Sequence, residues 1–337
     1  MARSSDGSPR LGLAAGLGLA ALGALGYAEL VSWARRAGVA NPALGELESH
    51  LDDWMAELAL SARHHYLYTP VGRVHVLEAG EGDDALVLLP GLAASAGEFG
   101  RLIKRLSSRH RVVAIDRPGT GLSDPVSFSG HPRDPWVRVI ATVVDQLCPE
   151  RFILVGHSVG GLAAGAFATE HPERVRRLVL LSPLGLERRI PPHWNLVLLP
   201  GALDLMAAAD RARRIRMLSR RASSAGGGVA PAPWPSPMEA YRRGVALRFG
   251  PGSDLAVLAR LVRPLALHPE SLLLPGLGLV ADRTIVVWGS RDRQLPLAGA
   301  RVALSRQPIL RLTVVEGEGH TLPFAKPGVV ADLIESA

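Results

Sequence analysis

The sequence predicts an α/β fold in which a mostly parallel sheet of eight strands is covered by helices on both faces. Three observations support this prediction. Short apolar runs alternate with helix-like patterns along most of the chain. The run at residues 152–155 breaks into Gly156-His157-Ser158-Val159-Gly160 and continues as an Ala-rich helix pattern. An interval of about a hundred residues, 184–280, then interrupts this alternation and stands apart as an insertion.

The N-terminal part consists of a tail, residues 1–10, and a hydrophobic segment, residues 11–34. Residues 11–28 carry no charged side chain and contain Leu, Ala and Gly with one Tyr. That length only just spans a bilayer. Three interpretations are open: a signal anchor, which we favour, a cleaved secretory peptide ending near Ala28, and a buried or interfacial helix. The first predicts a membrane-anchored protein and the second a secreted or periplasmic one.

A helix and a hairpin are expected next. Apolar residues recur at helical spacing within 41–63, which predicts an amphipathic connector helix lying on the domain or on a membrane. Residues 65–69 and 73–78 flank a Pro-Val-Gly turn and predict a β-hairpin. His64 and His65 have no acidic neighbours in this strand-like segment, so they predict no metal site.

The remaining strands belong to one core, residues 64–183 and 281–337, which the insertion divides. Helix patterns separate these strands, and this alternation is typical of parallel sheets with helices on both faces. The strands are expected near residues 85–90, 111–116, 151–156, 177–182, 284–289 and 310–315.

Ser158 is expected at a tight turn from a strand to a helix. Such a turn requires residues without a bulky Cβ two positions before and after the serine, which Gly156 and Gly160 provide. The helix expected over residues 159–170 points its N-terminus at the serine, where its N–H groups favour developing negative charge. Ser158 is therefore a candidate nucleophile. His157, beside it, is expected to hold a loop and not to act as a second base.

A serine nucleophile needs a base that takes its proton and an acid that orients the base. Asp292 and His320 each follow an expected strand on a loop, where titratable residues often act. We predict His320 as the base and Asp292 as the acid. Asp282 and Glu187 are the alternatives for the acid.

These residues and their surroundings resemble the α/β-hydrolase fold superfamily, in particular its capped serine esterases and lipases, over about residues 66–337. The order Ser, Asp, His is the family's order, and Asp116-Arg117-Pro118-Gly119-Thr120-Gly121-Leu122-Ser123 matches its Asp-x-x-Gly-x-Gly-x-Ser loop. The resemblance implies that the backbone N–H groups of Leu92 and Val159 form an oxyanion hole. It also implies a cap at residues 184–280. Pro90 stands where many members have a histidine that helps to hold this loop.

The resemblance implies a serine hydrolase that cleaves carboxylic esters, lipid-like or acylglycerol esters among them, through an acyl-enzyme intermediate. Carbon–carbon bond hydrolysis and cofactor-free perhydrolysis use the same residues and stay open. A non-catalytic, membrane-tethered binding protein is the alternative from another class. No cofactor or metal is expected, because the chain has one cysteine, Cys148, and no phosphate-binding glycine loop.

Basic residues concentrate in the predicted cap. Residues 184–280 hold 13 Arg and 6 Asp or Glu, and the difference of +7 equals the formal net charge of the whole chain. A basic cap with apolar runs would bind anionic lipid headgroups. A solvated surface is the other interpretation, because Arg replaces Lys nearly everywhere. No basic groove with interleaved aromatic residues is evident, so nucleic acid is not an expected partner.

Overall fold

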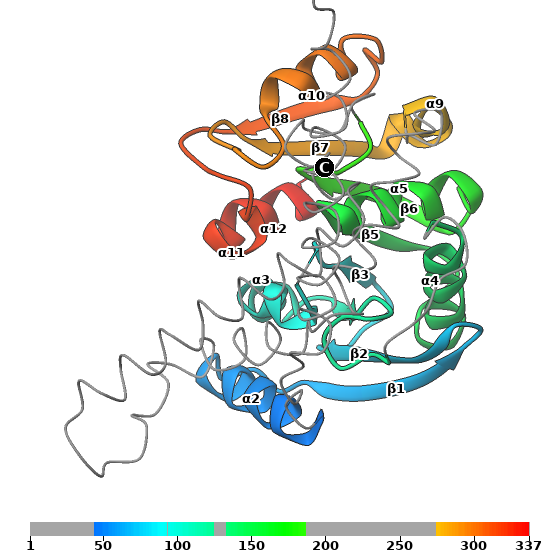
Figure 1. The fold of residues 1–337 in the computed structure, drawn as a ribbon, viewed down its shortest axis with the longest axis vertical. Coiled ribbons are helices and arrows are strands. Elements are labelled where there is room, and N and C mark those ends of the chain that lie inside the picture. Colours follow the sequence, from blue (N-terminus) through cyan, green and yellow to red (C-terminus); the bar gives the residue numbers. More distant parts are fainter. Residues whose placement is uncertain (1–43, 93, 125–132, 187–273, 337) are drawn as a thin grey trace, which may run out of the picture.

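The structure is a computed structural model that describes residues 44–92, 94–124, 133–186 and 274–336. Its eight strands form one sheet in the order β1-β2-β4-β3-β5-β6-β7-β8 (Figure 1). β1 and β2 form an antiparallel hairpin, β2 pairs antiparallel with β4, and every other pair is parallel. The predicted mostly parallel sheet of eight strands is confirmed.

Each strand overlaps the range that the sequence predicts for it. The strands are β1 (Arg63–Thr69), β2 (Gly72–Ala79), β3 (Ala85–Leu89), β4 (Arg111–Ile115), β5 (Phe152–His157), β6 (Val175–Leu181), β7 (Thr284–Gly289) and β8 (Arg311–Val315). The central strands β3 and β5 are buried along their whole length, which explains why their sequences are continuous apolar runs.

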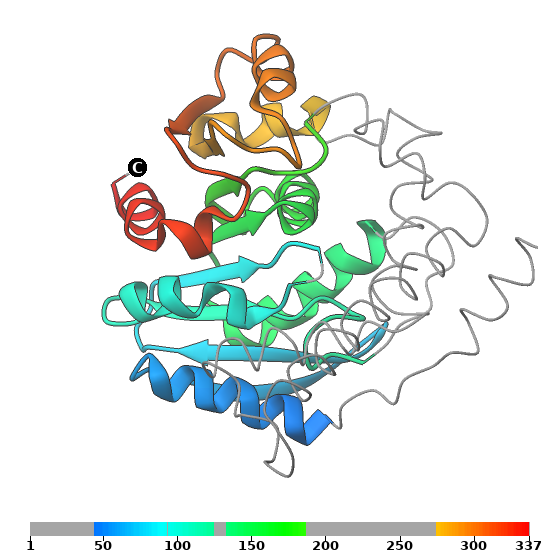
Figure 2. The same cartoon turned by 60° about the vertical axis from the view of Figure 1, so that its left-hand side comes forward.

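Helices cover both faces of the sheet, as predicted (Figures 1 and 2). One apolar layer packs the sheet against α4 (Arg133–Leu147), α5 (Val159–Glu170), α9 (Leu274–Leu277), η4 (Gly278–Arg283) and α10 (Leu297–Leu304). The other packs it against α2 (Leu44–Glu57), η1 (Ala96–Phe99), α3 (Gly100–Leu106), α11 (Leu322–Ala325) and α12 (Pro327–Glu335). Successive strand residues such as Val87 and Leu88 face opposite layers, as the two-residue period of a strand requires.

α2 lies within the range 41–63 in which the sequence predicts a connector helix. Leu47, Leu51 and Trp54 recur at helical spacing and are buried in the same layer as α3 and α12. Of the two settings expected for this helix, the structure therefore shows packing against the domain.

Three predicted segments lie wholly or mostly outside the described residues: the tail 1–10, the hydrophobic segment 11–34 and the cap 184–280. Of the cap, the structure describes residues 184–186 and 274–280. Leu184, Leu186 and Val280 are buried in the layer that contains α5. In the part of the chain that the structure describes, no helix has the length and apolar character needed to cross a membrane.

Candidate active site

Ser158 lies between β5 and α5 on a strained backbone. Its φ of 52° and ψ of −116° place it in a region that residues with a Cβ rarely adopt. The close approach of three segments explains the glycines on either side. A Cβ on Gly160 would lie 2.1 Å from the carbonyl oxygen of Leu89, and one on Gly156 would lie 2.5 Å from the carbonyl oxygen of Gly160. Neither distance is compatible with a side chain, so the tight turn expected around Ser158 is present.

The strand order brings the loops with the candidate residues to one edge of the sheet. β3, β5, β7 and β8 all run parallel, so their carboxyl ends point the same way. Leu92 follows β3, Ser158 follows β5, Asp292 follows β7 and His320 follows β8. Sequence positions more than two hundred residues apart therefore share one edge.

Asp292 and His320 form a buried hydrogen bond of 2.7 Å between Oδ2 and Nδ1. The other oxygen, Oδ1, accepts the N–H groups of Gln294 and Leu295, each at 2.9 Å. Burial raises the pKa of the Asp292 carboxyl, but its bonds to His320 and to these two amides lower the pKa further, so it lies below its ordinary value. The ionised carboxylate favours a proton on Nδ1 of His320 and leaves the lone pair of the neutral ring on Nε2.

The alternatives for the acid do not share this position. Asp282 is exposed within η4, on the segment that leads into β7. Glu187 lies outside the described residues. Proximity to the ring of His320 therefore favours Asp292, the residue that the spacing in the sequence indicated.

The loop after β3 is fixed by two charged side chains, the buried Arg117 and the partly buried Glu98. Arg117 donates from Nε to the carbonyl oxygen of Pro90 at 3.2 Å and from Nη2 to that of Gly91 at 2.5 Å. Its guanidinium also lies 5.3 Å from the ring centre of Trp136 on α4. The N–H of Gly91 donates to Oε2 of Glu98 at 3.1 Å. These contacts hold the loop in which Pro90 occupies the position of the family's histidine.

Sequence reasoning missed the partner of His157. Its Nδ1 lies 3.0 Å from Oε1 of Glu98, and its Nε2 lies 2.9 Å from the carbonyl oxygen of His320. Nε2 is placed to donate to this carbonyl, and the negative charge of Glu98 beside Nδ1 favours the protonated ring. The one hint in the sequence is a carboxylate between Gly97 and the buried Phe99, because a carboxylate in an apolar setting needs a partner.

Each member of this ion pair shifts the pKa of the other. Burial lowers the pKa of His157, but the negative charge of Glu98 raises it further, so it lies above its ordinary value. Burial raises the pKa of Glu98, and the positive charge of His157 then brings it below its ordinary value. His157 also stacks beside His320, with 4.9 Å between the ring centres. The pair thus joins the loops after β3, β5 and β8, and His157 holds a loop as the sequence predicted.

Two further results concern residues away from Ser158. Asp116 accepts the N–H of Leu122 at 2.9 Å and so fixes the turn that follows β4. The expectation that His64 and His65 have no acidic neighbours is wrong. His64 Nε2 lies 3.0 Å from Oδ1 of Asp52, and His65 Nε2 lies 2.5 Å from Oε2 of Glu78. The predicted hairpin brings β2 next to β1, and the fold adds α2, which no local pattern in the sequence places there.

Comparisons with known proteins agree with this architecture. A model of the alpha/beta hydrolase family matches residues 86–333. A 2-hydroxy-6-oxononadienedioate/2-hydroxy-6-oxononatrienedioate hydrolase of Escherichia coli is 31% identical over 260 residues, which cover 68% of this chain and 78% of that protein. Two solved structures share the fold. A membrane phospholipase A, a bacterial virulence factor, has a TM-score of 0.60 at 22% identity and covers 97% of both chains.

The second is naproxen esterase, carboxylesterase NP, from Bacillus subtilis. Its TM-score is 0.62 at 20% identity, and the match covers 86% of this chain and 96% of the esterase. Structural similarity at this low identity shows the fold alone. Membership of the family is shown by the family model, which matches far more than half of the chain. The chain therefore belongs to the alpha/beta hydrolase family.

Proposed function

We propose that this hydrolase cleaves carboxylic esters through an acyl-enzyme intermediate on Ser158. One observation supports this most directly: the 2.7 Å bond between His320 and Asp292 lies at the same sheet edge as the strained Ser158. An activated serine requires a base whose orientation is fixed by a third group. Asp292 supplies that orientation, and its pKa below the ordinary value keeps it charged at neutral pH.

The reaction follows from these positions. His320 takes the proton of the Ser158 hydroxyl on Nε2 as Oγ attacks the ester carbonyl. The N–H groups of Leu92 and Val159 donate to the oxyanion, and one such donor typically contributes a factor of about 10² to 10³ in rate. The imidazolium then gives its proton to the departing alkoxide. A water molecule activated by the same ring attacks the acyl-enzyme and releases the acid and Ser158.

Carbon–carbon hydrolysis is the second candidate, because the E. coli relative at 31% identity is named for that chemistry. It would use the same serine, base and oxyanion donors. The leaving group differs, however. An alkoxide needs a single proton, which the His320 imidazolium supplies, whereas a carbon leaving group also needs its negative charge stabilised before protonation. The described residues already supply what an ester requires, so we place ester hydrolysis first.

The test uses the purified full chain and a fluorophosphonate probe, followed by p-nitrophenyl esters of increasing chain length. We expect labelling and ester turnover in the wild type and neither in Ser158→Ala. Ser305→Ala, which changes an exposed serine on the surface near α10, is the matched control and should label like the wild type.

Other outcomes separate the alternatives. Labelling without ester turnover, with cleavage of a 2-hydroxy-6-oxo-dienedioate followed by its ultraviolet absorbance, would favour carbon–carbon hydrolysis. Turnover that requires hydrogen peroxide would favour perhydrolysis. Labelling that survives Ser158→Ala would contradict the assignment of the nucleophile. A folded wild type that neither labels nor turns over any substrate would favour the non-catalytic binding protein.

A further inference from the structure

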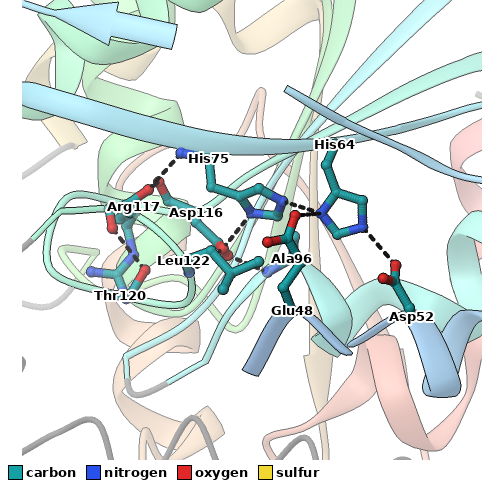
Figure 3. Close-up of polar contacts among 10 residues, drawn as sticks. Glu48, Asp52, His64, His75, Ala96, Asp116, Arg117, Thr120 and Leu122 are labelled. Atoms are coloured by element: carbon teal, nitrogen blue, oxygen red, sulfur yellow. Dashed lines mark hydrogen bonds and ion pairs between the residues drawn. The ribbon is translucent and has the colours of Figure 1, made fainter. Parts of the chain in front are cut away.

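A second polar cluster joins α2 to the sheet through a row of four side chains (Figure 3). Oδ1 of Asp52 lies 3.0 Å from Nε2 of His64, and Nδ1 of His64 lies 2.9 Å from Nε2 of His75. Nδ1 of His75 lies 2.7 Å from Oδ2 of Asp116. His75 and Asp116 are fully buried. None of the four has a part in the reaction proposed above.

The contacts of Asp116 tie this row to the backbone. Its Oδ1 accepts the N–H of Ala96 at 2.6 Å, and its Oδ2 accepts that of Leu122 at 2.9 Å. Oδ2 also lies 2.7 Å from Nδ1 of His75, so one carboxyl group joins the histidine to two backbone amides. Which nitrogen donates in each contact of the two rings depends on their tautomers.

Charged and titratable groups from three elements surround this pair. On α2, Oε1 of Glu48 lies 3.7 Å from Nδ1 of His64. On β1, Tyr66 donates to Glu48, and burial together with that carboxylate raises the pKa of its phenol, so it stays a donor. On β2, Arg73 lies 5.0 Å from the ring centre of Tyr66 and pairs with Asp124 at 3.2 Å. The two rings thus face carboxyl groups from α2 and from the end of β4.

The row continues into the helix that supports the loop after β3. Ala96, whose N–H binds Asp116, is the first residue of η1. Glu98, in the same short helix, accepts the N–H of Gly91 and pairs with His157. Asp116 therefore fixes the first residue of η1. Glu98, in the same helix, contacts Gly91 and His157 in the candidate active site.

α2 also contacts η1 directly. Nε1 of Trp54 donates to the carbonyl oxygen of Gly97 at 3.2 Å, and both groups are buried. A Cβ on Gly100 would lie 2.8 Å from that same Nε1, so the glycine permits the close approach of α2. α2 thus meets η1 by two routes, one through Trp54 and one through the histidine pair. This helix precedes the residues that the family model matches.

We propose that α2, through His64 and His75, positions the loop after β3 for catalysis by holding η1 and thereby Glu98 in place. The proposal rests on the serine-hydrolase function proposed above. Glu98 acts on the loop that contains Leu92, whose N–H is expected to bind the oxyanion, and not on the ground-state substrate. Loosening η1 therefore lowers kcat and leaves KM nearly unchanged. His64 and His75 are positioning residues, since both act on the site through Asp116 and η1.

The decisive variants change His64. His64→Leu removes both of its bonds, whereas His64→Asn keeps a donor at the place of Nδ1 and can still bind His75. We expect kcat and the rate of fluorophosphonate labelling to fall about tenfold in His64→Leu, within the range that residues remote from a site cause. His64→Asn should recover most of this loss, and KM should change less than about twofold in both. His50→Leu, on the same helix but outside the row, is the matched control.

One readout does not depend on activity. Hydrogen exchange at the Gly91 N–H should be faster in His64→Leu and unchanged in His50→Leu. A labelling rate and Gly91 exchange in a folded His64→Leu equal to those of the wild type would overturn the proposal. If the wild type is never labelled but Gly91 exchanges faster in His64→Leu, the positioning role of His64 would stand. The same result would reject the proposed serine-hydrolase function.

Discussion

Glu98 is a charged side chain in a place that disfavours charge. With 12% of its side chain exposed, it is stabilised by His157 on one oxygen and by the N–H of Gly91 on the other. Removing one member of a buried ion pair leaves the other charge without compensation, which typically costs about 3–5 kcal/mol. The loops after β3, β5 and β8 therefore depend on one carboxylate for part of their mutual position.

We predict that Glu98→Gln destabilises the protein most between about pH 4.5 and 6.5, by about 3–5 kcal/mol. The pKa of Glu98 is lowered from 4.5, so its contribution is present above that pH and is lost as the pH falls. The pKa of His157 is raised from 6.5, so its contribution is present below that pH and is lost as the pH rises through the folded value. Urea unfolding across this range, with exposed Glu81→Gln as the control, measures the difference. A difference that is the same at every pH would contradict the ion pair.

The sequence predicts some residues of the site and cannot predict others, for a physical reason. Ser158, Asp292 and His320 each follow a strand, so the period of the apolar runs and the flanking glycines reveal them. Glu98 and His64 have partners that only the folded chain brings near. No local pattern connects Glu98 to His157, and none connects His64 to a carboxylate on α2.

The junction of β3, β5 and α5 depends on close contact between backbones. α5 is buried from Val159 to Ala168, so it packs on nearly every side and its sequence shows little amphipathic character. Gly160 lets its first turn approach the end of β3. The helix and strands themselves were predictable from the apolar runs of the strands and from the Ala-rich pattern that follows Gly160. The order in which strands pair, with β4 between β2 and β3, was not, because it depends on contacts between distant segments.

We predict that Gly160→Ala destabilises the protein by about 3 kcal/mol or more, because its Cβ would meet the backbone of Leu89 and only a shift of β3 or α5 can relieve the clash. The same change should slow fluorophosphonate labelling, since the shift moves the loop after β3 relative to Ser158. Gly278→Ala is the control. A Cβ there has no neighbour within 4 Å, and we expect a change within about 0.5 kcal/mol. Equal thermal midpoints for the two variants would show that the junction tolerates a methyl group.

Charge is distributed unevenly over the whole molecule. Residues 184–280 account for the formal net charge of +7, so the remainder is close to neutral. The hydrophobic segment 11–34, whose residues 11–28 carry no charged side chain, is the second segment that we predict to contact a membrane. These two features differ in their response to salt, because exposed charges are screened over about 10 Å at 0.1 M and about 3 Å at 1 M, whereas burial of apolar side chains in lipid is not screened.

We predict two separable components when the full chain is sedimented with vesicles. Binding to neutral phosphatidylcholine vesicles should persist at high salt, because segment 11–34 alone contributes it. Adding anionic phosphatidylglycerol should increase binding, and about 1 M salt should remove this increment, since each basic residue near an anionic surface contributes about 1 kcal/mol at low salt. Changing Arg211, Arg213, Arg214 and Arg216 to Gln should reduce the increment and leave binding to neutral vesicles intact. No binding to neutral vesicles would reject the membrane anchor, and equal binding to both lipids would assign the arginines to a solvated surface.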